Sequence, residues 1–144
     1  MIGPLEQRKK RQMKTLIVED DIDSARILAS YLSDYSDCEI VTDGRQALYN
    51  VELAFREEEP FDLVCLDIMM PNMDGQQALK RIRDIEFKRG IMPGKGARIV
   101  MVSALSDNDN ILHSFVNLSD GYLVKPYSKA ELFDKLRELR LIRG

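Results

Sequence analysis

Five polar residues lie at the ends of four short apolar runs, and their types together suit phosphoryl transfer. Glu19 and Asp20 follow one run, and the others follow three more: Asp67, Ser103 and Lys125. Clustered carboxylates repel one another, and a hard divalent cation such as Mg²⁺ relieves that repulsion. A lysine ammonium and a serine hydroxyl can hold phosphoryl oxygens, and an aspartate can be the nucleophile. If these side chains meet in the fold, they predict Mg²⁺-dependent phosphoryl transfer to an aspartate.

The elements that must position these residues alternate along the chain from Thr15 onward. Short apolar runs predict five strands, at residues 16–18, 38–41, 61–66, 99–102 and 122–124. Apolar residues at helical spacing predict five helices, at residues 22–35, 47–55, 78–85, 111–116 and 132–139. Ser128, with Glu131 three residues later, is a capping box that marks the start of the last helix.

This alternation predicts an α/β domain, built as a doubly wound, five-stranded parallel sheet of order 2-1-3-4-5 with five helices. The strands are apolar throughout, as expected when helices cover both faces of the sheet. In that order the first, third, fourth and fifth strands are contiguous. Ligands of such sheets bind at the carboxyl ends of the strands, so the five polar side chains are expected to converge on one crevice.

Each of these residues has a plainer interpretation when it is taken alone. An acidic residue after a strand can cap the next helix, and we assign Asp21 and Asp23 to that role. An aspartate at the end of a buried strand can be structural, a serine there is often a turn residue, and a lysine before proline is often on the surface. The prediction of phosphoryl transfer therefore depends on the convergence of all five.

Four blocks of the sequence resemble the CheY-like receiver domains of two-component response regulators, in that family's order and at its spacing. They are LIVEDD at 16–21, DLVCLDIMMPNMDG at 62–75, VSA at 102–104 and GYLVKPY at 121–127. The resemblance covers about residues 13–142, and the stretch from Asp67 to Gly75 is its most specific part. It implies the flavodoxin/CheY-like form of the doubly wound fold.

The resemblance also implies a role for each site residue. Asp67 would accept the phosphoryl group from a sensor histidine kinase or a histidine phosphotransfer protein. Lys125, beside a cis bond to Pro126, would pair with the phosphoryl oxygens. Ser103 would move to hydrogen-bond the phosphoryl group, and Tyr122 would follow it inward and change the face made by the fourth helix, fifth strand and fifth helix. Mg²⁺ would be held by Glu19, Asp20, Asp67 and the backbone carbonyl of Met69.

Some features of this chain distinguish it from other members of the family that it resembles. Ser103 stands where many relatives have threonine, which keeps the hydroxyl group. Met69 and Leu105, two residues beyond Asp67 and Ser103, occupy positions that influence loss of the phosphoryl group in this family. Both are apolar and unable to orient water, so we expect slow self-dephosphorylation. The loop at 88–96 is longer than usual in the family, and partner specificity could lie there.

We expect one receiver domain at residues 13–144, preceded by a basic tail at 1–12, and no output domain, because nothing remains after the fifth helix for a second one. The tail is expected to be solvated, with a docking arm for an acidic partner as the alternative. The signal would pass to a downstream protein target by direct contact, from a monomer or a weak dimer.

The composition of the chain is that of a globular protein, with 44% hydrophobic and 31% charged residues. The net charge of -3 argues against nucleic acid as a general partner. No apolar run approaches the roughly 20 residues that a membrane span needs, and no secretory leader opens the chain. We therefore expect a cytoplasmic protein without membrane contact.

Other classes of protein fit the sequence less well. A phosphatase of the haloacid-dehalogenase type would need a second aspartate where Met69 stands, so we expect a signalling protein, not an enzyme, that catalyses only its own phosphorylation and dephosphorylation. An interaction module that is never phosphorylated would not need all five site residues. His113 is expected to be an ordinary residue of the fourth helix. Cys38 and Cys65, far apart and outside any CxxC motif, predict buried structural thiols and no zinc site.

Overall fold

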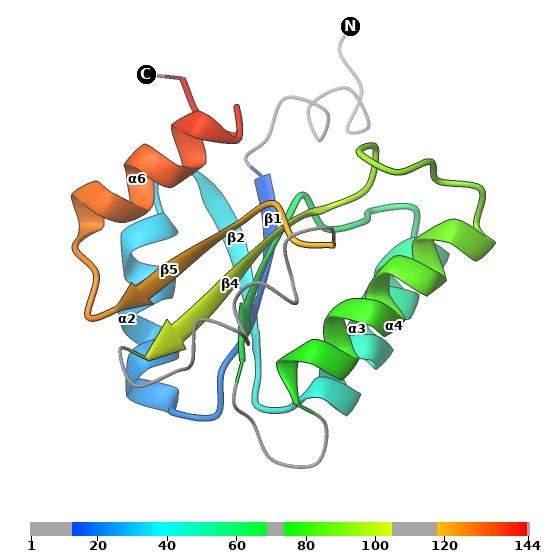
Figure 1. Ribbon diagram of the computed structural model, residues 1–144, viewed down its shortest axis with the longest axis horizontal. Helices are drawn as coiled ribbons and strands as arrows, with labels where there is room; N and C mark the ends of the chain where they lie inside the picture. Colours follow the sequence, from blue (N-terminus) through cyan, green and yellow to red (C-terminus); the bar gives the residue numbers. More distant parts are fainter. Residues whose placement is uncertain (1–12, 69–73, 105–117, 144) are drawn as a thin grey trace, which may run out of the picture.

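Five parallel strands form one sheet in the order β2-β1-β3-β4-β5, with helices on both of its faces (Figure 1). The computed structural model describes residues 13–68, 74–104 and 118–143. The strands are β1 (Met13–Val18), β2 (Ser36–Val41), β3 (Leu63–Asp67), β4 (Arg98–Ala104) and β5 (Gly121–Lys125). The helices are α2 (Ile22–Leu32), α3 (Gly44–Arg56), α4 (Gly75–Lys88) and α6 (Lys129–Glu138). This confirms the predicted α/β fold and strand order, while the predicted helix at 111–116 lies outside the described residues.

Buried apolar side chains form one layer of core on each side of the sheet. Along β1, Leu16 and Val18 belong to the layer under α3 and α4, and Ile17 belongs to the layer under α2 and α6. This alternation follows from the two-residue period of a strand. All five residues of β3 are buried, which explains why its sequence is apolar without a break until Asp67. No helix within the described residues is both long and apolar enough to cross a membrane.

The first two strands begin earlier than the apolar runs predict. β1 begins at Met13 and β2 at Ser36, and these two residues are paired in the sheet. Thr15 and Ser36 are buried, and their hydroxyl oxygens lie 2.6 Å apart and share a hydrogen bond. A pattern of apolar residues cannot predict these starts, because the two polar side chains are buried by hydrogen-bonding to each other.

Side chains cap the amino ends of all four described helices. The Asp21 carboxylate accepts a hydrogen bond from the backbone N–H of Asp23, which confirms Asp21 as a cap and places Asp23 in the first turn of α2. The predicted capping box of Ser128 and Glu131 is present at the start of α6. Asp74 caps α4, so this helix begins at Gly75, three residues before the first apolar position that predicted it.

A partly buried ionic network joins α4 to the amino ends of β4 and β5. The Arg83 guanidinium donates to the Glu86 carboxylate at 2.8 Å, to the Asp120 carboxylate at 2.9 Å, and to the backbone carbonyls of Ala97 and Leu118 at 2.8 Å each. The second carboxylate oxygen of Glu86 accepts from the backbone N–H of Ala97 at 2.8 Å. The network fixes this end of the domain, opposite to the carboxyl ends of the strands.

We predict that Arg83→Met lowers the free energy of unfolding by about 3 kcal/mol, because it leaves the buried Glu86 carboxylate without its ion-pair partner. Denaturant unfolding measures the change. Arg81→Met, on the exposed face of the same helix, is the matched control and should change stability by less than about 0.5 kcal/mol. Equal losses in the two variants would contradict a stabilising role for the network.

The two cysteines are free thiols with different degrees of protection. Cys65 lies in the middle of β3 and is buried, and Cys38 is partly buried in β2. Burial raises the pKa of the Cys65 thiol to about 12, and burial also raises the pKa of Cys38. The prediction of buried structural thiols is confirmed for Cys65 and holds in part for Cys38.

We predict that a disulfide reagent at pH 8 leaves Cys65 unmodified in the folded protein, because a thiol with a pKa of about 12 is protonated at that pH. Raising the pH toward 9 should speed labelling of Cys38 and leave Cys65 protected. Mass spectrometry of the Cys38→Ser variant isolates the response of Cys65. Labelling of Cys65 at the rate seen in denaturant would contradict its burial.

Candidate functional site

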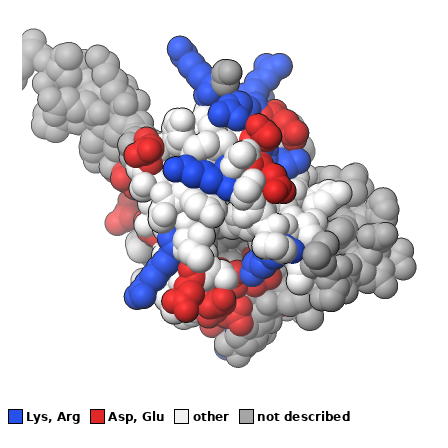
Figure 2. Space-filling model, turned by 90° about the vertical axis from the view of Figure 1, so that its left-hand side faces the viewer, with Lys and Arg blue, Asp and Glu red and all other residues white. Residues whose placement is uncertain are grey.

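The carboxyl ends of four strands bring the predicted polar residues to one edge of the sheet. Glu19 follows β1, Asp67 ends β3, Ser103 lies near the end of β4, and Lys125 ends β5. The strand register places Asp67 opposite Val102 and Lys125 opposite Ala104, so the neighbouring strands end at nearly the same level. The convergence that the strand order predicted is therefore observed. Figure 2 shows acidic side chains gathered at the lower edge of the molecule, which is the edge at which the strands end in Figure 1.

Three carboxylates form a cluster at this edge. Glu19, Asp20 and Asp67 each offer an oxygen atom, and these atoms lie within 4.8 Å of one another. Glu19 and Asp67 are almost buried, at 6% and 9% exposure, whereas Asp20 is exposed. Hard oxygen donors from carboxylates, open to solvent on one side, suit Mg²⁺, which keeps several of its own waters. The residues present fit the predicted ion.

Lys125 supplies a cation to this acidic cluster. Its ammonium nitrogen donates to the carboxylate of Glu19 at 2.5 Å and lies 3.8 Å from a carboxylate oxygen of Asp67. The ion pair spans 106 positions of sequence and joins the first strand to the last. The bond between Lys125 and Pro126 is cis, as the resemblance implied.

The pKa shifts show how charge is distributed in the cluster. Burial by itself would raise the pKa of Glu19, but hydrogen bonds with Asp67 and Lys125 bring it below its ordinary value. Burial, and then the hydrogen bond with Glu19, raise the pKa of Asp20. Burial would lower the pKa of Lys125, but the hydrogen bond to Glu19 and the charge of Asp67 raise it. Glu19 and Lys125 are therefore held in their charged forms, whereas the charged form of Asp20 is disfavoured.

Ser103 lies beside this cluster with an unused hydroxyl group. Its side chain is fully buried, and within the described residues its hydroxyl has no hydrogen-bond partner. A buried polar group left in this state costs about 1–3 kcal/mol, so such groups are rare in folded proteins. The hydroxyl lies near the carboxyl end of β4, the strand that pairs with the one ending in Asp67.

Gly75 also belongs to the site, but its role is structural and could not be predicted from side-chain chemistry. Its backbone N–H donates to the carbonyl of Ile68 at 2.8 Å. A Cβ atom at Gly75 would overlap the backbone carbonyl oxygen of Asp67 and would lie 2.8 Å from the Cα of Ile68. Only glycine permits this approach of α4 to the end of β3. The Asp74-Gly75 pair in the quoted motif was the signal for it.

The remaining predicted residues divide into two groups. Tyr122 lies in β5 with its side chain 52% exposed, so the described conformation has this ring on the outside. Met69, Leu105 and His113 lie outside the described residues, and the predictions made for them stay predictions.

Comparisons with known proteins agree with this geometry. The family model of the response regulator receiver domain matches residues 15–137. The transcriptional regulatory protein CiaR of Streptococcus pneumoniae is 32% identical over 127 residues, which are 88% of this chain and 51% of CiaR. The probable transcriptional regulatory protein SilR of Salmonella typhimurium is 34% identical over 132 residues, 92% of this chain and 52% of SilR. The chain spans about half the length of these relatives.

A solved structure extends the likeness to the fold. The receiver domain of the Francisella response regulator 1452 is 28% identical, with a TM-score of 0.66, over 89% of this chain and 96% of that domain. The family match, the strand order and the cluster of acidic residues with Lys125 lead to the same assignment. The chain belongs to the response regulator receiver domain family.

Proposed function

We propose that this chain accepts a phosphoryl group on Asp67 in a Mg²⁺-dependent reaction and changes a protein-interaction surface as a result. The observation that carries the proposal is the position of Asp67, which shares an acidic cluster with Glu19 and Asp20 and has the Lys125 ammonium 3.8 Å away. The donor would be a phosphohistidine of a sensor histidine kinase or of a histidine phosphotransfer protein.

The proposed transfer follows from the chemistry of the groups in the site. A carboxylate oxygen of Asp67 forms a bond to phosphorus, and the phosphorus–nitrogen bond of the phosphohistidine breaks. The imidazole keeps the electron pair and takes up a proton from solvent. Glu19, Asp20 and Asp67 would hold Mg²⁺, and the carbonyl of Met69 remains a predicted further ligand. When bound, Mg²⁺ offsets the negative charge that the phosphoryl group brings to three carboxylates.

Lys125 provides the second positive charge for the phosphoryl group. In the described structure its ammonium group is paired with Glu19 at 2.5 Å. A phosphoryl group on Asp67 would place oxygen atoms near this ammonium, which could then exchange a carboxylate partner for a phosphoryl oxygen. The side chain is already within 3.8 Å of Asp67, so the exchange needs only a small movement.

Ser103 and Tyr122 would convert the new charge into a change of surface. The buried Ser103 hydroxyl gains a hydrogen-bond partner when it turns to the phosphoryl group, which favours the phosphorylated conformation. Movement of Ser103 would let Tyr122, now half-exposed on β5, turn toward the interior. Phosphorylation then acts as a two-state switch biased by one new charge.

The switch would signal through protein contact, without turnover of a substrate. The position two residues after Asp67 is Met69, so the second carboxylate that a phosphatase of the haloacid-dehalogenase type needs is missing from the sequence. We propose that the face made by the predicted fourth helix, β5 and α6 contacts a downstream protein, and that the protein works in the cytoplasm. The relatives CiaR and SilR are named as transcriptional regulators, so control of transcription is the alternative output of the pathway.

We predict that the purified protein, given Mg²⁺ and acetyl phosphate, gains the mass of one phosphoryl group. Asp67→Asn should abolish the gain, because the amide oxygen cannot replace the carboxylate as nucleophile. Intact mass spectrometry measures the product, and Asp84→Asn, an exposed change on α4, is the matched control. A phosphoryl group that persists in Asp67→Asn would contradict the assignment of the phosphoacceptor.

We also predict that the phosphorylated protein loses its phosphoryl group slowly, and that Met69→Asn speeds the loss. An amide at this position can orient a water molecule toward the phosphorus atom, whereas the thioether of methionine cannot. Decay after removal of acetyl phosphate, followed by mass spectrometry, gives the two rates. Equal rates would show that this position does not control the lifetime of the phosphoryl group.

A further inference from the structure

A cavity of about 440 Å³ opens at the amino end of the sheet, at the edge opposite to Asp67. It lies between the end of α3, the start of β3, and the loop that joins α4 to β4. Its size falls within the range of about 300–1,000 Å³ that is usual for small-molecule sites. Nothing in the phosphoryl-transfer site uses this cavity.

One part of the cavity wall is apolar. Side chains from α3, β3, α4 and the following loop line it: Val51, Phe55, Phe61, Val64, Ile82 and Ile91. Several of them belong to the buried core under α3 and α4, so the floor of the cavity is the edge of the core. A ligand must therefore bring an apolar body to displace water from these walls.

Two of the aromatic walls are held in position by cations outside the cavity. The Lys14 ammonium lies 4.7 Å from the centre of the Phe61 ring and donates to the carbonyl of Glu59 at 2.7 Å. The Arg89 guanidinium lies 4.9 Å from the centre of the Phe55 ring and pairs with Glu52 at 3.0 Å. These contacts fix both rings before any ligand binds, so the apolar side of the cavity is preformed.

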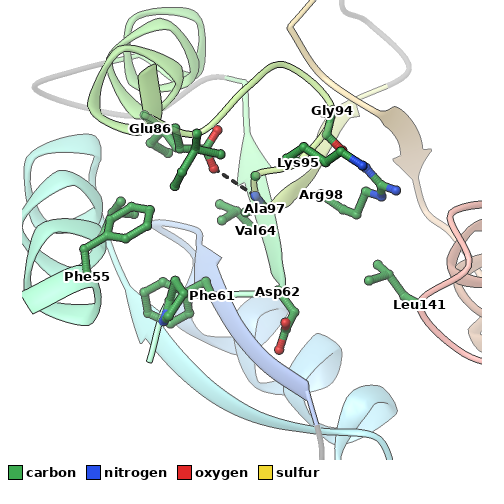
Figure 3. Close-up of a pocket in the computed structure, with 15 residues that line it drawn as sticks. Phe55, Phe61, Asp62, Val64, Glu86, Gly94, Lys95, Ala97, Arg98 and Leu141 are labelled. Carbon is green, nitrogen blue, oxygen red and sulfur yellow. Dashed lines mark hydrogen bonds between the residues drawn. The ribbon is translucent and has the colours of Figure 1, made fainter. Parts of the chain in front are cut away.

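The acidic groups of the cavity are already engaged. The Asp62 carboxylate accepts the backbone N–H of Lys14 at 2.8 Å. One carboxylate oxygen of Glu86 accepts from Arg83, and the other accepts from the backbone N–H of Ala97, each at 2.8 Å. The second of these bonds is drawn in Figure 3. Both oxygens of Glu86 and one oxygen of Asp62 therefore already accept hydrogen bonds from the protein.

The basic groups of the cavity are less engaged. The Lys95 side chain is exposed, and within the described part of the chain it has no ion pair or hydrogen bond. Arg98 donates to the carbonyl of Gly94 at 3.3 Å and lies 3.9 Å from the carboxylate of Asp120, which is a weak ion pair. Figure 3 shows Phe55 and Phe61 on one side of the cavity and Lys95 and Arg98 on the other.

From this arrangement we propose that the cavity binds a small carboxylate with an apolar, preferably aromatic, body. The ring would lie against Phe55 and Phe61, and the carboxylate would reach across to Lys95 and Arg98. The site thus selects a ligand with an apolar group at one end and one negative charge at the other. This ligand site is separate from the phosphoacceptor and does not depend on the function proposed for it.

Titration of the full chain with hydrocinnamate, followed by amide NMR spectra, tests the proposal. We expect saturable shifts of the resonances of Val64, Lys95 and Ala97, and no comparable shift at Glu19 or Lys125. Hydrocinnamyl alcohol has the same ring and chain without the charge, and it should bind about tenfold more weakly, because it loses the charge-assisted hydrogen bonds. Hydrocinnamyl amine should not bind.

Two variants separate recognition of the carboxylate from general apolar binding. Lys95→Gln should weaken hydrocinnamate binding about tenfold and leave binding of the alcohol unchanged. Lys88→Gln removes an exposed charge that does not line this cavity and should leave both affinities unchanged. Lys95 is exposed, so its replacement is not expected to disturb folding.

Three results would overturn the proposal. The first is the absence of saturable shifts with hydrocinnamate at the cavity residues. The second is binding of the alcohol or the amine with the affinity of the carboxylate, which would mean that charge is not recognised. The third is unchanged carboxylate affinity in Lys95→Gln.

Discussion

The fold must hold three carboxylates close together against their mutual repulsion, and the rest of the structure is arranged around that constraint. Glu19, Asp20 and Asp67 offer oxygen atoms within 4.8 Å of one another, and two of these side chains are almost buried. Such a cluster is unfavourable by itself. The pairing of Lys125 with Glu19 at 2.5 Å offsets part of the repulsion, while burial and the neighbouring Glu19 raise the pKa of Asp20. A divalent cation would offset the remaining negative charge, including that of a phosphoryl group on Asp67.

The parallel sheet meets this constraint because its strands end together. Residues far apart in the sequence, such as Glu19 and Lys125, become neighbours when the first and last strands stop at the same edge. Close packing then fixes the distances, most clearly where the Gly75 backbone lies against the carbonyl of Asp67. Among the described residues the buried Ser103 hydroxyl has no hydrogen-bond partner, and a phosphoryl group on Asp67 would supply one under the proposed function. The opposite edge is fixed by the Arg83 network, so the two ends of the domain have separate roles.

The sequence predicted the strand order and the convergence of the site residues, because both follow from apolar runs that stop at polar residues. Its limits have physical causes. The early starts of β1 and β2 depend on the hydrogen bond between Thr15 and Ser36, which no apolar pattern records. The network of Arg83 and Glu86 could not be predicted, since only the tertiary fold brings the backbone of Ala97 and Leu118 to them. The cavity beside Lys95 could not be predicted for the same reason, because separate segments of the chain form its walls.

The central claim is that Asp67 and Lys125 form a phosphoryl site completed by a metal ion. A crystal structure with Mg²⁺ and beryllofluoride measures this most directly. The account predicts beryllofluoride bonded to a carboxylate oxygen of Asp67, Mg²⁺ among Glu19, Asp20 and Asp67, and the Lys125 ammonium turned from Glu19 to a fluoride. The Ser103 hydroxyl should donate to another fluoride. A pocket without metal or beryllofluoride, with Lys125 still paired to Glu19, would contradict it.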